Sequence, residues 1–209
     1  MELPFKADSS FFKHAENNGN VVVGRHAMRA PDSYGSFILE PTPIEAAKLP
    51  FGIISPGPSR HGIQRSQHFR LPVFGMDQVP SVEAAAWINN NDATLNKFKD
   101  DTFLINFSTR LDDLPRVSLQ QALQGNIVQE LVKGRTVMVA FREKRVELGV
   151  HTPITPHDSP MSSAEFHAFA LNTLLSGKVI REGNAFSALA VSALAALLAL
   201  LSYHRLPDQ

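Results

Sequence analysis

The stretch SSAEFHAFALNTLLSG, residues 162–177, predicts an amphipathic helix that packs one face against a protein core. Ser162 and Glu165 have the spacing of a capping box, in which each side chain bonds the backbone of the other residue. One helical stripe carries the residues Phe166, Phe169, Ala170, Thr173 and Leu174. Gly177 can end the helix, because glycine readily adopts the left-handed conformation that follows a last helical turn.

Short apolar runs before this helix predict strands. Four such runs occupy residues 20–24, 51–55, 102–107 and 136–141. The run at 136–141 follows Lys133-Gly134-Arg135 and is almost continuously apolar, so we expect a central strand that is covered on both faces. Residues 63–72 alternate polar and apolar side chains and predict an exposed strand or hairpin.

Helix signals lie between these strands. A helix is expected from about Ser81 to Trp87, and Thr42-Pro43-Ile44-Glu45 has the pattern of a short helix start. Ser118 and Gln121 form a second capping box before a brief helix that Gly125 can terminate. Strands that alternate with helices predict an α/β fold, with a mixed or mostly parallel sheet flanked by helices.

The C-terminal segment has a different character. Residues 185–203 include no formal charge over 19 positions, and as a helix they would extend about 28 Å, close to the thickness of a bilayer core. We therefore predict a transmembrane helix from Phe186 to Tyr203; the alternative is an alanine-rich core helix. The expected domains are residues 1–182 and a membrane helix with a short tail at 183–209. A small-residue stripe allows a dimer through membrane helices, and it consists of Ala188, Ser192, Ala195 and Ala199.

Composition excludes several classes of protein. The 20 basic residues balance the 20 acidic ones and are scattered, so a nucleic acid partner is not expected. There is no cysteine, which excludes disulfides and thiolate nucleophiles. The first residues have neither a basic nor an apolar region of the kind that forms an export signal.

The sequence shows no catalytic machinery. Nucleotide-binding loops, a zinc-protease motif and a nucleophile elbow are all missing. The richest polar cluster contains His151, His157 and His167, which could serve a metal or a hydrolytic base. However, Glu165 is explained by its capping box, and His167 lies about 200° away from it around the helix. No enzyme activity, cofactor or metal is therefore predicted.

These motifs occur in the order typical of one family, the type-two CHASE domain, an extracellular sensory module found ahead of bacterial cyclases and histidine kinases. Val132 to Val139 resembles its glycine-then-strand segment, and His151-Thr152-Pro153 resembles its Thr-Pro loop. Residues 165–177 are similar to its Glu-x-His-Ala helix. Weaker similarity is found at Gly62-Ile63-Gln64-Arg65 and at Val79-Pro80-Ser81.

The resemblance implies both a role and a set of motif residues. These residues, which we expect to be structural, are Gly62, Arg65, Gly134, Thr152, Pro153, Glu165, His167 and Asn172. The family usually has aspartate where this chain has His61. The resemblance also implies a domain truncated at its N-terminus that ends in the family's following transmembrane helix.

Three hypotheses follow from the sequence. The leading one is an extracytoplasmic sensory domain of a bacterial membrane signal-transduction protein at the inner membrane, in the periplasm, that responds to an unknown small-molecule or protein signal. The second is a membrane-tethered interaction module that faces the cytoplasm. The third is a histidine-dependent hydrolase or metal enzyme.

Overall fold

The fold is described from a computed structural model of the 209-residue chain. The structure describes residues 9–29, 37–40, 48–54, 59–91, 96, 100–110, 113–140, 149–156, 159–180 and 185–205. The helix start predicted at residues 42–45 lies outside these ranges.

The main sheet has three strands and mixed direction. Its strands are β1 (Val23–Arg29), β2 (Phe37–Leu39) and β3 (Phe51–Ile54), in the order β2-β1-β3. β1 pairs antiparallel with β2 and parallel with β3, in a register that places Gly24 opposite Gly52. The predicted mixed α/β class is confirmed, and the expected strands near residues 21–24 and 51–55 are present.

Six shorter strands form antiparallel pairs beside this sheet. These strands are β4 (Ser59–Arg60), β5 (Ile63–Gln64), β6 (Ser66–His68), β7 (Arg70–Pro72), β8 (Gln78–Pro80) and β9 (Thr102–Leu104). β4 pairs with β5, β6 with β9, and β7 with β8. The pairing of β6 with β9 joins segments that are more than thirty residues apart and so holds the middle of the chain together.

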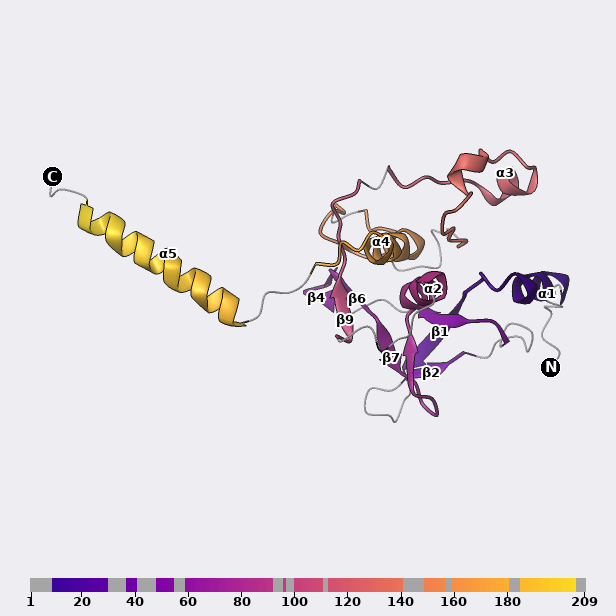
Figure 1. The fold of residues 1–209 in the computed structure, drawn as a ribbon, viewed down its shortest axis with the longest axis horizontal. Helices are drawn as coiled ribbons and strands as arrows, with labels where there is room; N and C mark the ends of the chain where they lie inside the picture. Colours follow the sequence, from indigo (N-terminus) through magenta and orange to yellow (C-terminus); the bar gives the residue numbers. More distant parts are fainter. Residues whose placement is uncertain are drawn as a thin grey trace.

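Helices cover and extend this framework. They are α1 (Ser9–Asn18), α2 (Val82–Asn91), α3 (Leu119–Leu123), the 3₁₀ turn η4 (Gln129–Leu131), α4 (Ser163–Leu175) and α5 (Ala185–Arg205). Figure 1 shows α4 beside α2 above the strands, whereas α3 and α5 project away from the body. Both predicted capping boxes are present, at Ser118 and at Ser162, and Gly125 and Gly177 adopt positive φ beyond their helices.

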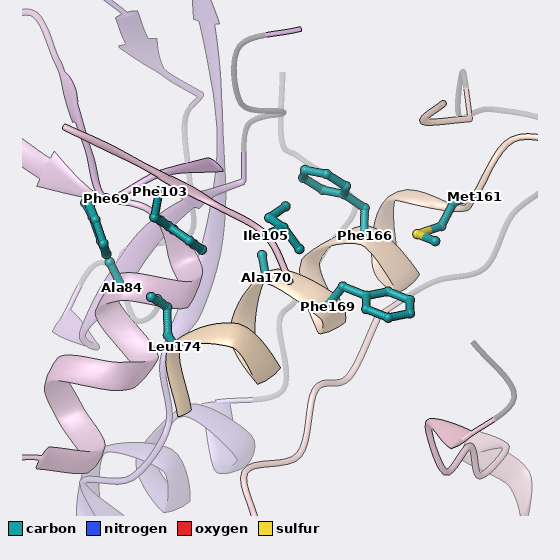
Figure 2. Packing of buried hydrophobic residues seen from close by; sticks show 9 residues of the cluster. All are labelled: Phe69, Ala84, Phe103, Ile105, Met161, Phe166, Phe169, Ala170 and Leu174. Carbon is teal, nitrogen blue, oxygen red and sulfur yellow. The ribbon is translucent and has the colours of Figure 1, made fainter. Parts of the chain in front are cut away.

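The core lies where α2, α4 and β9 meet. Its buried residues are Phe69, Ala84, Phe103, Ile105, Met161, Phe166, Phe169, Ala170 and Leu174. Figure 2 shows Leu174 of α4 pointing toward Ala84 and Phe103, whereas Phe169 points the other way. The predicted apolar stripe of residues 166–174 is therefore confirmed, and it supplies much of the core.

Gly52 sets how closely α2 approaches the main sheet. A Cβ atom at this position would lie 2.4 Å from the Cα of Val82 and 2.5 Å from the carbonyl oxygen of Ser81. Real Cβ atoms do not come so close to backbone, so only glycine allows the first turn of α2 to rest on β3. This contact fixes the start of α2 and every side chain on its first turn.

The structure corrects two predictions about strands. Residues 136–140 form no strand, and Val137 and Val139 are exposed, Val139 by 81%. At the end of β9, Leu104 is already paired with Ser66 on one side and with Ile180 on the other. An apolar run with no vacant strand edge has no partner for its backbone groups.

The prediction of an exposed hairpin at 63–72 is also wrong. This segment forms three strands, and Gln64, Gln67, Phe69 and Leu71 are all buried. Phe69 and Leu71 enter the two core clusters, whereas Gln67 is buried because it has polar partners.

α5 covers the segment predicted to cross a membrane, residues 186–203, and it is helical throughout. Among the described residues, however, no helix combines the length and the apolar character that crossing a bilayer requires. The prediction of a transmembrane helix is corrected on this point.

Candidate functional site

A polar cluster lies inside the apolar core between α2, α4 and β6. Glu83 from the first turn of α2, His167 from α4 and Gln67 from β6 are all buried, and Glu83 has no exposed surface. His167 Nδ1 lies 2.5 Å from Glu83 Oε1. Gln67 Nε2 lies 3.1 Å from the same oxygen and 3.4 Å from His167 Nδ1.

One arrangement of hydrogens satisfies these distances. Gln67 Oε1 accepts a hydrogen bond from the backbone N–H of His68, so the amide orientation is fixed and Gln67 Nε2 must donate. Nδ1–H of His167 and Nε2–H of Gln67 then both donate to Glu83 Oε1. The carboxylate also lies in the first turn of α2, where the helix dipole favours negative charge.

The other carboxylate oxygen is exceptional. Glu83 Oε2 is buried and has no hydrogen-bond partner among the described residues. A buried acceptor without a partner costs roughly 1–3 kcal/mol, more when the group is charged. Neither of the two cavities that the structure describes is lined by Gln67, Glu83 or His167. The three side chains are almost fully buried, and the cluster joins three elements of the fold.

The capping box at the start of α4 is reinforced by an ion pair. The backbone N–H of Ser162 donates to Glu165 Oε2 at 3.0 Å, and the N–H of Glu165 donates to Ser162 Oγ at 3.3 Å. The guanidinium of Arg116 lies 3.1 Å from Glu165 Oε1. Glu165 therefore caps the helix, whereas His167 bonds to Glu83 on another face of it, as predicted from their angular separation.

A polar pocket of about 330 Å³ lies at the other end of α4. Asn172, Thr173 and Ser176 come from this helix, and the segment after β9 contributes Asn106 and Asp113. Two cations complete the lining, Arg135 and Lys178. Thr173 forms a fixed part of the wall, because its hydroxyl donates to the carbonyl of Phe169 at 2.8 Å and accepts from the N–H of Asn106 at 3.0 Å.

A second cavity, of about 550 Å³, lies near the beginning of β3 and the end of α2. Its lining is mostly apolar and includes Leu49, Phe51, Val79, Ala85 and Ile88. Lys48 and Asp77 supply the only charges among its lining residues, one of each sign. This cavity offers less chemical discrimination than the polar pocket.

The glycine of the predicted Gly-x-x-Arg motif has a clear local role. His61 and Gly62 both have positive φ, 55° and 76°, and they form the two-residue turn between β4 and β5. A turn of this kind favours asparagine or aspartate before glycine, and histidine also tolerates the left-handed region. His61 therefore occupies the position where the family usually has aspartate without breaking the turn. Arg65 is exposed, and its carbonyl accepts from the N–H of Ile105.

The predicted Thr-Pro loop is held by Thr152 and Thr155. Thr152 is buried, its N–H donates to the hydroxyl of Thr155, and that hydroxyl donates to the carbonyl of Thr152. Pro153 lies in the turn between them. The carbonyl of His151 accepts from the N–H of Gln64, which ties this loop to β5.

The remaining predicted motif residues meet at the polar pocket. Asn172 lines it, and its side chain contacts the hydroxyl of Thr109 at 3.5 Å. Gly134 has positive φ in an exposed turn that places Arg135 at the same pocket. The segment 132–135 is therefore brought to the end of α4, although the strand expected after it does not form.

The proposed histidine metal site is not seen in the residues that the structure describes, since these contain no group of three metal-ligating side chains. His157 lies outside them, and His167 points to Glu83. Gln67 and Glu83 were not predicted as site residues. The sequence does contain a feature that could have identified Glu83 as a site residue. It is the charged residue of the otherwise apolar start of α2, and its position does not complete a capping box with Ser81.

The fold and these polar sites define a small mixed α/β domain in which buried hydrogen bonds join helices to strands. The chain belongs to the CHASE2 domain family, whose model matches residues 5–203. CHASE2 domains are sensory domains of signalling proteins rather than catalytic ones, and they typically lie outside the cytoplasm. No curated protein and no solved structure matches the chain.

Proposed function

We propose that this chain is the extracytoplasmic sensory domain of a bacterial membrane signalling protein at the inner membrane, and that it regulates an output elsewhere without catalysing a reaction. Membership of the CHASE2 family supports this role. The arrangement of polar groups supports it as well, since the side chains of the Gln67–Glu83–His167 cluster are buried and join helices to a strand. The signal is a small molecule or a protein.

The observation that carries the proposal is the position of α4. His167 near its beginning bonds to Glu83 of α2, which also accepts from Gln67 of β6, and Asn172 and Thr173 near its end line the polar pocket. Figure 1 shows the chain continuing from α4 toward α5, which projects away from the body. One rigid helix therefore contacts the core, a candidate binding site and the exit from the domain.

A sensor works by having two states that bind its signal differently. In our proposal the buried cluster defines the resting position of α4, because a polar group in a core is satisfied in only one packing arrangement. A signal that shifts the end of α4 would act against this cluster. Residues 1–182 form the sensory unit, and residues 183–209 carry its conformation onward. Gly62, Arg65, Gly134, Thr152, Pro153, Glu165, His167 and Asn172 shape the unit.

The side of the membrane can be tested in spheroplasts, from which the outer membrane has been removed, prepared from cells that express the full receptor. Lys133 and Arg135 lie in an exposed segment, so external trypsin should cleave the domain there. The control is a Lys133→Gln/Arg135→Gln variant, which should lose this cleavage. Protection of the wild-type segment in intact spheroplasts, followed by cleavage after lysis, would contradict the proposal and favour the cytoplasmic interaction module.

A further inference from the structure

We infer that the polar pocket at the end of α4 binds a small polar carboxylate, which would be the signal of this domain. The inference rests on the proposed sensory function and deepens it. Its evidence is the charge of the pocket, the state of its hydrogen-bonding groups, and its size.

The charges lining the pocket favour an anion. Arg135 and Lys178 supply two positive charges, and Asp113 supplies one negative charge. The carboxylate of Asp113 is already engaged in a turn, where its Oδ2 accepts from the backbone N–H of Arg110 at 3.3 Å. In the described ranges, neither Arg135 nor Lys178 has a side-chain hydrogen bond or an ion pair with another residue. The two cations are therefore available to a ligand.

The wall of the pocket is fixed before any ligand binds. Thr173 joins α4 to the segment after β9 through its two hydrogen bonds, and Asn106 Oδ1 accepts from the N–H of Ser108 at 2.9 Å. Asn172 has only one long contact, at 3.5 Å, so most of its amide hydrogen-bonding capacity is unused. A rigid wall with a free amide and two free cations suits a ligand that carries an anionic group and further polar atoms.

The size and lining of the pocket restrict the ligand. A volume of about 330 Å³ lies at the lower end of the range for small-molecule sites. Leu114 and Pro115 are the apolar residues in its described lining, which includes no aromatic ring. A nucleobase would have no stacking surface there. The planar guanidinium of Arg135 matches a carboxylate through two parallel hydrogen bonds, and the Lys178 ammonium adds a point charge.

Calorimetric titration of the full chain tests this inference, with malate, succinate and L-glutamate as probes at constant ionic strength. We expect at least one of these carboxylates to bind and to raise the melting temperature. Malamide, the neutral diamide of malate, should not bind. Arg135→Gln and Lys178→Gln should each weaken binding by about tenfold, which corresponds to about 1.4 kcal/mol, because each removes one charged hydrogen-bond donor from the pocket.

The matched control is Lys133→Gln, which removes the same charge from the same exposed segment outside the pocket lining. Its affinity should stay within about twofold of the parent, since a charge outside the site acts only through screened solvent. All three variants change exposed residues and should fold like the parent. No binding by any carboxylate at millimolar concentration, equal binding of malamide or of inorganic phosphate, or equal loss in Lys133→Gln would overturn the inference.

The two proposals fail in different ways. If no carboxylate binds but trypsin still cleaves from the extracytoplasmic side, the ligand assignment is overturned and the sensory placement stands. If a carboxylate binds but the domain lies in the cytoplasm, the ligand assignment stands and the extracytoplasmic placement is overturned.

Discussion

α4 and α5 are consecutive helices of similar apolar composition, yet their surroundings differ completely. α4 buries seven residues over its 13 positions, among them Phe166, Phe169 and Leu174. Along α5, the described large apolar side chains are exposed, and they are Leu189, Val191, Leu194, Leu197, Leu198 and Leu200. Figure 1 shows the first helix against the strands and the second apart from them.

The difference shows that apolar content alone does not decide burial. α4 carries a capping box, a histidine that meets a buried carboxylate, and a threonine that bonds to its own helix and to Asn106. Each of these polar groups has a partner supplied by another part of the fold or by the helix itself. α5 has no such contacts with the rest of the described chain, and its Ser202 hydroxyl bonds only to the carbonyl of Leu198 in the same helix.

A leucine-to-alanine substitution should change the free energy of unfolding very differently in the two helices. Leu174 is 4% exposed and Leu197 is 52% exposed. Leu174→Ala should lower the free energy of unfolding by roughly 3–5 kcal/mol, because it leaves a cavity in the core. Leu197→Ala should change it by less than about 0.5 kcal/mol. Urea denaturation of both variants measures the pair, and equal losses would show that α5 is buried in the folded protein.

The buried polar cluster predicts the next largest effect. His167→Ala should lower the free energy of unfolding by about 3 kcal/mol, because Glu83 loses its closest partner while its second oxygen is already without one. A double-mutant cycle with Glu83→Ala should give a coupling of about 1 kcal/mol or more. Denaturant titrations of the parent, the two single variants and the double variant measure this coupling. Additive losses would mean that the two residues act independently.

The two capping boxes give a smaller contrast. Ser162→Ala should cost about 1 kcal/mol, since it removes the cap of a helix that supplies the core. Ser118→Ala removes an equivalent cap from α3, which buries no residue, so the global free energy of unfolding should change by less than about 0.5 kcal/mol. Thermal denaturation of the two variants compares them. A larger loss at Ser118 would reverse the assignment of α4 as the structural helix.

Acid should lower the stability of the fold through His68 on β6. Burial lowers the pKa of His68 from its ordinary 6.5, and the nearby Asp101 carboxylate opposes this by raising it. The unfolded chain therefore takes up a proton first as the pH falls below 6.5. Stability from this residue is complete above that pH, declines below it, and levels off once the folded protein is also protonated.

His68→Gln should remove this part of the pH dependence. The free energy of unfolding, measured by urea titration on both sides of pH 6.5, should fall more for the parent than for the variant. This is the smallest effect of the series, because Asp101 offsets part of the burial. Identical slopes for the two proteins would show that His68 does not titrate differently on folding.

The parts of the fold that could be predicted from sequence depend on neighbouring residues. The capping boxes at Ser118 and Ser162, the stops at Gly125 and Gly177, and the apolar stripe of α4 are all local patterns, and all are confirmed. The strand expected at 136–141 failed because an apolar run does not reveal whether a strand edge is free to receive it. Here Ile180, which follows α4 in the chain, occupies that edge.

The candidate sites were only partly predictable, since their partners are distant in sequence. His167 and Asn172 could be singled out, but Gln67 precedes His167 by 100 residues and Glu83 precedes it by 84. From sequence, Gln67 in an alternating strand is predicted to be exposed. Its burial follows from the two partners that the fold brings to it.

This separation also has a consequence for the order in which the protein is made. When α2 emerges from the ribosome, Glu83 still lacks the histidine that will bond to it, because 84 further positions must be added. At about 5–20 residues per second, translation delivers that histidine roughly 4–17 s later. During this interval the nascent chain holds a carboxylate that cannot yet be buried beside its partner, so α2 and β6 can close into a core only after α4 has been synthesised.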